Sequence, residues 1–430
     1  MNAVQLLTLD PGHFHAALVQ KEMVAGVDRR VHVYAPLGPD LIGHLARIAG
    51  FNGRAENPTA WELEVHAGPD FLERMLRDRP GNVVVLAGRN AQKIDYIEAA
   101  VAAGLHVLAD KPWIIVPEHL PKLQAILDQA GARGLVAYDI MTERFEITSI
   151  LQRALVHDAE TFGALLPGTE AEPGVLLESV HYLKKLVAGA PLRRPPWFFD
   201  IRQQGEGLSD VGTHLVDLAT WIMFPDQAID HQKDIAILSG KRWPTSLTRA
   251  DFEAITGEPK FPAYLAAAVQ GDRLDYFCNN QVRYTVRGVH IRLDALWDFE
   301  AAPGAGDTHR AVFQGTRARI EVRQGKEENF TPELYVVPQL PGDLPAVAAA
   351  LRCKVDRLQA AFPGVAVEEV SDRLRVRIPD RYRTGHEAHF ALVARLFLSY
   401  LAKPQALPAW EKPNMLAKYF VSTEGTRRGG

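Results

Sequence analysis

The chain has 430 residues, of which 47% are apolar and 23% are charged, a composition typical of packed globular proteins rather than disordered ones. This length favours about two or three domains. The 48 lysines and arginines against 52 aspartates and glutamates give a net charge of −4, so the overall charge offers no argument for a nucleic acid or an anionic membrane as partner. Only Cys278 and Cys353 occur, which excludes a disulfide framework and a CxxC metal site.

The N-terminal segment shows no basic stretch followed by an apolar signal core. No apolar run reaches the length of about 18 residues that a membrane-spanning helix needs. We therefore expect a cytoplasmic protein that makes no membrane contact.

Residues 1–145 alternate between short apolar runs and helical stretches. The alternation predicts βαβ units and a doubly wound parallel sheet of the Rossmann type, which binds ligands at the carboxyl ends of its strands. A first helical stretch is expected to reach Val24. The apolar runs that predict strands are 4–9, 31–35, 82–87, 105–109 and 135–138.

Residues 146–425 have a different texture and predict a C-terminal α+β domain. Helices are expected at 147–157, at about 209–224 and at 385–401, and the polar residues 426–430 are expected to fray. Alternating apolar and polar runs predict a large, mostly antiparallel open sheet. The segment at about 340–380 is interpreted as an added helix and hairpin. The alternating runs are 281–286, 290–299, 310–314 and 318–323.

The turn after the first expected strand should carry the glycines of a dinucleotide site. It reads Asp10-Pro-Gly-His-Phe-His15, and only Gly12 matches, because Leu7 and Leu9 stand at the other two positions. The second strand is followed by no acid until Asp40, although an acid there would hold an adenosine ribose. Either a divergent nucleotide site or an ordinary βα turn fits this segment.

Two later segments carry groups suited to proton transfer. Lys111 follows Asp110 directly after a buried strand, where such a sheet places its chemistry. Asp210 and His214 are spaced i, i+4, so one face of a helix would hold a carboxylate that orients an imidazole base. The alternatives are a solvated lysine at a strand end, and a helix cap beside a half-buried histidine.

Taken together, these segments resemble the glucose–fructose oxidoreductase / inositol dehydrogenase family (Gfo/Idh/MocA). The resemblance rests on Asn90 and Gly104 followed by His106-Val-Leu-Ala-Asp-Lys-Pro112, on Arg202 followed by Gly205-Glu-Gly-Leu-Ser-Asp-Val-Gly-Thr-His214, and on Phe313-Gln-Gly-Thr316. It implies a Rossmann domain at 1–145 and a C-terminal substrate and oligomerisation domain at 146–425.

The resemblance also implies roles for individual residues. Lys111, His214 and Asp210 match the catalytic lysine and the carboxylate–histidine pair, and Trp113 and Arg202 are expected to contact substrate. Lys93 stands where many members carry a histidine. The residues expected to line the cofactor are Asp10, Gly12, His13, Phe14, Gly88, Arg89, Asn90, Asp110 and Lys111.

The function that follows from the resemblance is hydride transfer between NAD(P), with NAD slightly favoured, and a sugar, polyol or related hydroxy compound. Two alternatives stay open: an NAD-dependent enzyme that cleaves glycosides through transient oxidation, and a non-catalytic sensor, which the missing glycines motivate. We expect a homodimer or homotetramer. No metal is expected, although His13 and His15 alternate and could share a face as ligands, because the sequence offers no nearby third ligand.

Overall fold

The computed structural model describes residues 4–187 and 190–430. They form two compact units. The first comprises Met1–Thr142, Arg202–Gly205 and Gly385–Lys412, and the second comprises Glu143–Ile201, Glu206–Thr384 and Pro413–Gly430. The segment 385–412, expected in the C-terminal domain, thus folds with the first unit. Among the described helices, none is both long and apolar enough to cross a membrane.

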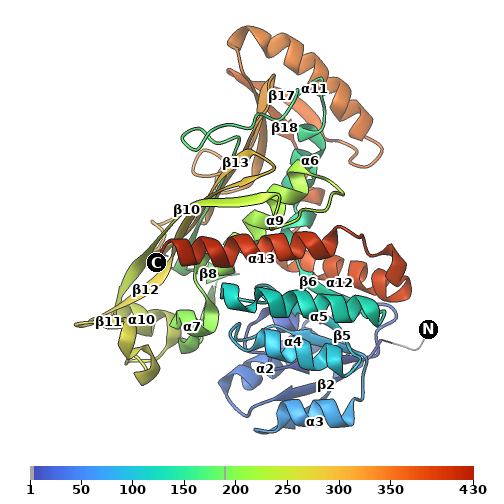
Figure 1. Cartoon of the computed structure of the whole chain (residues 1–430), viewed down its shortest axis with the longest axis vertical. Coiled ribbons are helices and arrows are strands. Elements are labelled where there is room, and N and C mark those ends of the chain that lie inside the picture. The colour runs from blue at the N-terminus through green and yellow to red at the C-terminus, as the bar shows by residue number, and fades with distance from the viewer. Residues whose placement is uncertain (1–3, 188–189) are drawn as a thin grey trace. The chain divides into compact units, whose positions relative to one another are not determined.

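The sheet of the first unit has six strands in the order β3-β2-β1-β4-β5-β6 (Figure 1). Every neighbouring pair is parallel. This is the strand order of a dinucleotide-binding Rossmann sheet, and it confirms the predicted fold class. The strands are β1 (Leu6–Leu9), β2 (Arg30–Ala35), β3 (Glu62–Ala67), β4 (Val83–Leu86), β5 (His106–Asp110) and β6 (Ala137–Ile140).

Helices connect these parallel strands, as a doubly wound sheet requires. The first, α1, covers only His15–Leu18, so the expectation that it would reach Val24 was wrong. All four residues of β4 are buried, which explains its uninterrupted Val-Val-Val-Leu sequence. The other helices of this region are α2 (Pro39–Gly53), α3 (Phe71–Asp78), α4 (Lys93–Ala102), α5 (Leu120–Ala132) and α7 (Ile201–Gln204).

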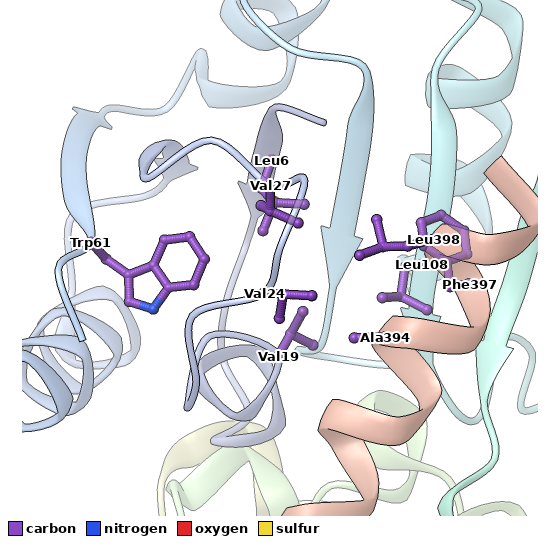
Figure 2. A pocket seen from close by; sticks show the side chains of 9 residues that line it. All are labelled: Leu6, Val19, Val24, Val27, Trp61, Leu108, Ala394, Phe397 and Leu398. Carbon is purple, nitrogen blue, oxygen red and sulfur yellow. The ribbon is translucent and has the colours of Figure 1, made fainter. Parts of the chain in front are cut away.

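A helix from near the C-terminal end, α12 (His386–Ala402), completes the core of the first unit. Its apolar face meets β1, β5 and the segment after α1 around a small apolar cavity (Figure 2). The Phe397 side chain is almost fully buried there, and Trp61 closes another side with its indole donating to the Gln20 carbonyl. The cavity is lined by Leu6, Val19, Val24, Val27, Trp61, Leu108, Ala394, Phe397 and Leu398.

The second unit is built on a ten-stranded sheet in the order β10-β12-β13-β7-β14-β15-β16-β18-β17, with β11 also paired to β12. Among the described strands of this sheet, only β13 and β7 run parallel, so the predicted, mostly antiparallel open sheet is confirmed. Its strands are β7 (Val175–Lys184), β10 (Ile235–Thr248), β11 (Val269–Gln270), β12 (Arg273–Val286), β13 (Val289–Glu300), β14 (Thr308–Gln314), β15 (Ala318–Gln324), β16 (Glu333–Pro338), β17 (Ala366–Val370) and β18 (Arg373–Arg377). A separate two-stranded ribbon joins β8 (Leu186–Val187) and β9 (Ala190–Pro191).

The segment at 340–380 extends this sheet at one end. It contains α11 (Leu344–Leu358) and the hairpin β17–β18, and β18 pairs with β16. Figure 1 shows α11 lying over β17 and β18. Its buried residues Val347, Leu351 and Val355 recur at helical spacing and join the main core of the second unit.

The remaining helices of the second unit include α6 (Ile147–Val156), α8 (Gly207–Asp210), α9 (Gly212–Met223) and α10 (Arg249–Thr256). The last helix, α13 (Glu411–Arg428), continues through residues 426–428, so the expected fraying there was wrong. Its Gly425 approaches Gly240 of β10 so closely that a Cβ on Gly240 would lie 2.4 Å from the Gly425 carbonyl oxygen. The missing side chains let this end of α13 pack directly on the strand.

Candidate active site

In the first unit, the turn after β1 packs against the turn after β4. Asp10 has a positive φ of 46°, and the His13 amide donates to the Ala87 carbonyl over 3.0 Å. A Cβ on Gly88 would lie 2.2 Å from the Asp10 carbonyl oxygen, so only glycine permits this contact. The structure therefore brings Asp10–Phe14 and Gly88–Asn90 together at the carboxyl edge of the sheet, where the strand order reverses between β1 and β4.

One basic and two acidic side chains lie at this edge. The Arg89 guanidinium lies 3.4 Å from the Asp40 carboxylate at the start of α2, and both side chains are partly exposed. Burial raises the pKa of Asp10, and Arg89 only partly offsets this effect. Asp40, the first acid after β2, thus lies within reach of the Gly88–Asn90 turn through Arg89.

Leu7 and Leu9, which replace two fingerprint glycines, are fully buried. Their side chains belong to the core of the sheet, so they do not occupy space at the carboxyl edge where a ligand would bind. The close approach of backbone at Gly88 and the positive charges of Arg89 and Lys111 fit a dinucleotide. Within the described chain, the short α1 and the lack of an acid at the end of β2 fit it less closely than a standard fingerprint.

Lys111 follows β5, with its side chain largely buried and a cis peptide bond to Pro112. Asp110 precedes it, and its carboxylate Oδ2 lies 2.8 Å from His15 Nδ1. Burial alone would raise the pKa of Asp110, but His15, Lys93 and Lys111 outweigh it and hold the pKa well below its usual range. The Asp110 carboxylate is therefore ionised beside the lysine.

Lys93 stabilises the segment that carries Lys111 through hydrogen bonds. Its almost fully buried ammonium donates to Asn90 Oδ1 at 2.6 Å, to the Asp110 carbonyl at 2.9 Å and to the Pro112 carbonyl at 3.1 Å. It thereby fixes the chain on both sides of Lys111. No periodicity in the sequence signals this role, because two of the three oxygens belong to Asp110 and Pro112, which lie 17 and 19 residues from Lys93 along the chain.

The two expected substrate contacts differ in exposure. Trp113 is completely buried, and its indole donates to the Ala109 carbonyl at 3.2 Å. It is a core residue in this structure, which corrects the expectation that it faces a ligand. Arg202, on α7, is exposed.

In the second unit, the sequence around Asp210 and His214 forms two helices rather than one. The chain leaves α8 after Asp210 and enters α9 at Gly212. The start of α8 packs directly on β12, because Gly207 has no Cβ that would collide with the Cys278 carbonyl. The Leu208 amide also donates to Asn280 Oδ1 on the same strand. This anchoring places the partly exposed Asp210 one turn before the largely buried His214.

Asp217, which lies on α9, forms ion pairs that hold this region of the fold together. Its carboxylate accepts two hydrogen bonds from Arg144, at 2.6 and 2.7 Å, and lies 3.4 Å from the Lys418 ammonium of α13. Burial would raise the pKa of Asp217, but Arg144 and Lys418 lower it to about 2. The ion pairs tie α9 to α13 and to the loop before α6.

Comparison with known proteins places the chain in a family. Residues 151–428 match the family described as "Putative oxidoreductase C terminal domain". A solved structure from Parabacteroides merdae, described as a "putative oxidoreductase", is 46% identical with a TM-score of 0.97 and covers 100% of this chain and 98% of its own. No curated protein matches the chain.

More distant structures share the fold. KijD10, a 3-ketoreductase from Actinomadura kijaniata solved with NADP and TDP-benzene, is 14% identical, covers 99% of this chain and 98% of its own, and has a TM-score of 0.56. GenD2 from gentamicin A biosynthesis, solved with NAD, is 16% identical, covers 100% of this chain and 95% of its own, and has a TM-score of 0.57. The chain therefore belongs to the family described as "Putative oxidoreductase C terminal domain", and it shares its fold with KijD10 and GenD2.

Proposed function

We propose that the protein transfers hydride between a nicotinamide dinucleotide and a CH–OH group of a sugar, a polyol or a related hydroxy compound. One observation carries the proposal. In a sheet of Rossmann strand order, the Gly88 turn and the Asp110–Lys111 segment end adjacent strands at the ligand-binding edge. The NADP and NAD complexes of KijD10 and GenD2, which share the fold, support a nicotinamide cofactor.

The cofactor would be held by the first unit and would supply the hydride-accepting ring. Gly88 admits close approach of the ligand to the backbone, and Arg89 offers a guanidinium to a phosphate oxygen. Gly12, His13 and Phe14 would line the same edge. We favour NAD slightly, because the residues that directly follow β2 offer no arginine for a 2′-phosphate.

The acid–base chemistry is assigned to three residues of this chain. His214 takes the hydroxyl proton of the substrate, and Asp210 orients the imidazole. Lys111 stabilises the developing alkoxide through its ammonium. Lys93 supports Lys111 by fixing the carbonyls on either side of it.

Substitution of the acid–base groups tests these assignments. With any sugar or polyol that reduces the cofactor, Lys111→Ala and His214→Ala should each lower kcat by about 10²–10⁴-fold, the usual effect of losing one positioned proton-transfer group. Lys122→Ala is a matched control, because Lys122 pairs with Asp95 and Glu98 on the exposed side of α5 and α4. Near-wild-type turnover in both test variants would contradict the assignment.

The cofactor itself can be tested without a known substrate. Calorimetric titration with NAD and with NADP should show one nucleotide per chain, and mass spectrometry should identify any nucleotide released from the purified protein. Binding of neither nucleotide at millimolar concentration would refute the proposed reaction and favour the sensor alternative. Firmly held NAD without net reduction on a glycoside would favour glycoside cleavage.

We also propose a homo-oligomer, with the open ten-stranded sheet as its interface. The edge strand β10 exposes the large apolar side chains of Leu238 and Trp243. A sheet edge presents unpaired backbone groups that can pair with another chain, and apolar side chains on it would add to such a contact. Sedimentation equilibrium should give a dimer or tetramer, and Trp243→Glu should shift the distribution towards the monomer.

A further inference from the structure

Three potential metal ligands converge in the first unit. His13 Nδ1 lies 3.7 Å from Asp110 Oδ2, and His15 Nδ1 lies 2.8 Å from the same oxygen. One ligand atom from each of the three residues lies within 4.8 Å of the others. Asp110 thus supplies a potential third ligand atom, which the sequence near the two histidines does not offer.

The surrounding fold holds these side chains in place. The His13 amide donates to the Ala87 carbonyl, which fixes the turn, and Lys93 binds the carbonyl of Asp110. Asp110 and His15 are both more than nine-tenths buried, whereas His13 is partly exposed. The cluster therefore combines a rigid, largely buried interior with one side open to solvent.

Aromatic rings from α12 line the far side of His15. Its ring centroid lies 4.7 Å from that of Phe390 and 5.6 Å from that of His386. Such a shell limits the access of water and restricts rotation of the imidazole. The orientation of His15 is thus restricted both by its hydrogen bond to Asp110 and by its ring contacts with α12.

The distances suit a small tetrahedral cation. Bonds of about 2.0–2.1 Å at tetrahedral angles put neighbouring ligand atoms about 3.3 Å apart. The distances of 2.8 and 3.7 Å lie on either side of that value, so small side-chain movements would bring the atoms into coordination. Two imidazoles and one carboxylate form a ligand set used by divalent transition metals, zinc among them.

We propose that His13, His15 and Asp110 bind one divalent transition-metal ion of the zinc class, with an open coordination position. The Lys93 ammonium donates to Asn90 Oδ1 and to two main-chain carbonyls, and its charge also helps to hold the Asp110 carboxylate ionised. The positive charge of Lys111 beside the site favours an anion, such as hydroxide or an alkoxide, as the exogenous ligand. The ligand set is defined without reference to the nicotinamide cofactor, so the inference does not rest on the proposed function.

A second histidine–acid cluster provides the control. His32, Glu64 and His66 on β2 and β3 also place potential ligand atoms near one another. There, however, the His66 ring stacks on Tyr34 at 4.5 Å and 14°, and Glu64 is exposed. His66→Ala is therefore the matched control for removal of a histidine from the proposed site.

The test uses the full-length protein stripped with a chelator and dialysed. Titration with Zn²⁺ should give one tightly bound ion per chain, and cobalt(II) should develop the intense visible absorption of a four- or five-coordinate site. His13→Ala and His15→Ala should weaken binding by at least about 10–100-fold, the range seen when even a supporting residue of a metal site is lost. His66→Ala should bind like the wild type.

Several outcomes would overturn the proposal. These are no stoichiometric binding by the wild type, the spectrum of hexa-aqua cobalt at saturation, or wild-type affinity in both His13→Ala and His15→Ala. The cobalt spectrum of the wild type decides the question even if a variant fails to fold. Parallel titrations with NAD and NADP separate the two proposals, because nucleotide binding without metal binding refutes only the metal site, and the reverse result refutes only the cofactor assignment.

Discussion

Asp217 offers a sharp test of how the second unit is held together. Asp217→Asn keeps the size of the side chain but removes the negative charge between Arg144 and Lys418. The pKa of about 2, against a usual value of 3.8, corresponds to about 2 kcal/mol of stabilisation by the native environment. The loss on substitution should be larger, about 3–5 kcal/mol, because two buried cations are left facing each other without this carboxylate.

Differential scanning calorimetry at neutral pH should show this loss as a fall in one unfolding transition on the order of 10 °C. Asp226→Asn is the control, because Asp226 is exposed and its pair with Arg153 should contribute less than about 1 kcal/mol. Since the folded pKa is depressed, the difference between wild type and Asp217→Asn should shrink as the pH falls from 3.8 through about 2. A Tm for Asp217→Asn within the error of the control would refute the reasoning.

Three further substitutions probe other parts of the structure. Burial and the neighbouring Glu143 raise the pKa of Glu146 to about 7. Wild-type stability should therefore fall as the pH rises from about 5 to 8, because ionisation of Glu146 is disfavoured in the folded state. In Glu146→Gln the melting temperature should change less over that pH range. Gly88→Ala would place a methyl group against the Asp10 carbonyl, so it should weaken binding of NAD or NADP in calorimetry and lower the melting temperature of the first unit. Phe397→Ala should cost about 3–5 kcal/mol in urea unfolding, and a loss below about 1 kcal/mol would mean that α12 contributes little to that core.

The fold class was predictable because its signal is local. Buried parallel strands such as β4 read as apolar runs, and helices separate them. The edge strand β3 was missed because its Glu62–Ala67 sequence is mostly exposed and carries no apolar run. β10 was missed for another reason: Gly240 and Pro244 interrupt it, and an edge strand tolerates both residues.

In the candidate site, too, local features could be predicted from the sequence and contacts between distant segments could not. The position of Lys111 directly after a buried strand could be predicted, because it follows from a short motif within one segment, whereas Asp210 and His214 were expected on one helix and lie on two. The hydrogen bonds of Lys93 to the main chain around Lys111 and the approach of Asp110 to His13 and His15 could not, since each joins segments that are far apart in the sequence. The burial of Trp113 was likewise invisible, because an aromatic residue after a strand can face either the core or the solvent.

The packing of α12 against β1 and β5 has a consequence for biosynthesis. Leu6 and Leu108 leave the ribosome early, but their partner Phe397 is made only after most of the chain (Figure 2). During translation the apolar side chains that pack on α12 therefore stay uncovered until the second unit has been synthesised. Exposed apolar surface of this kind promotes aggregation and binding by chaperones. Nascent chains that are arrested before α12 should accordingly bind ribosome-associated chaperones. The first unit should become protease-resistant only after α12 has left the ribosome.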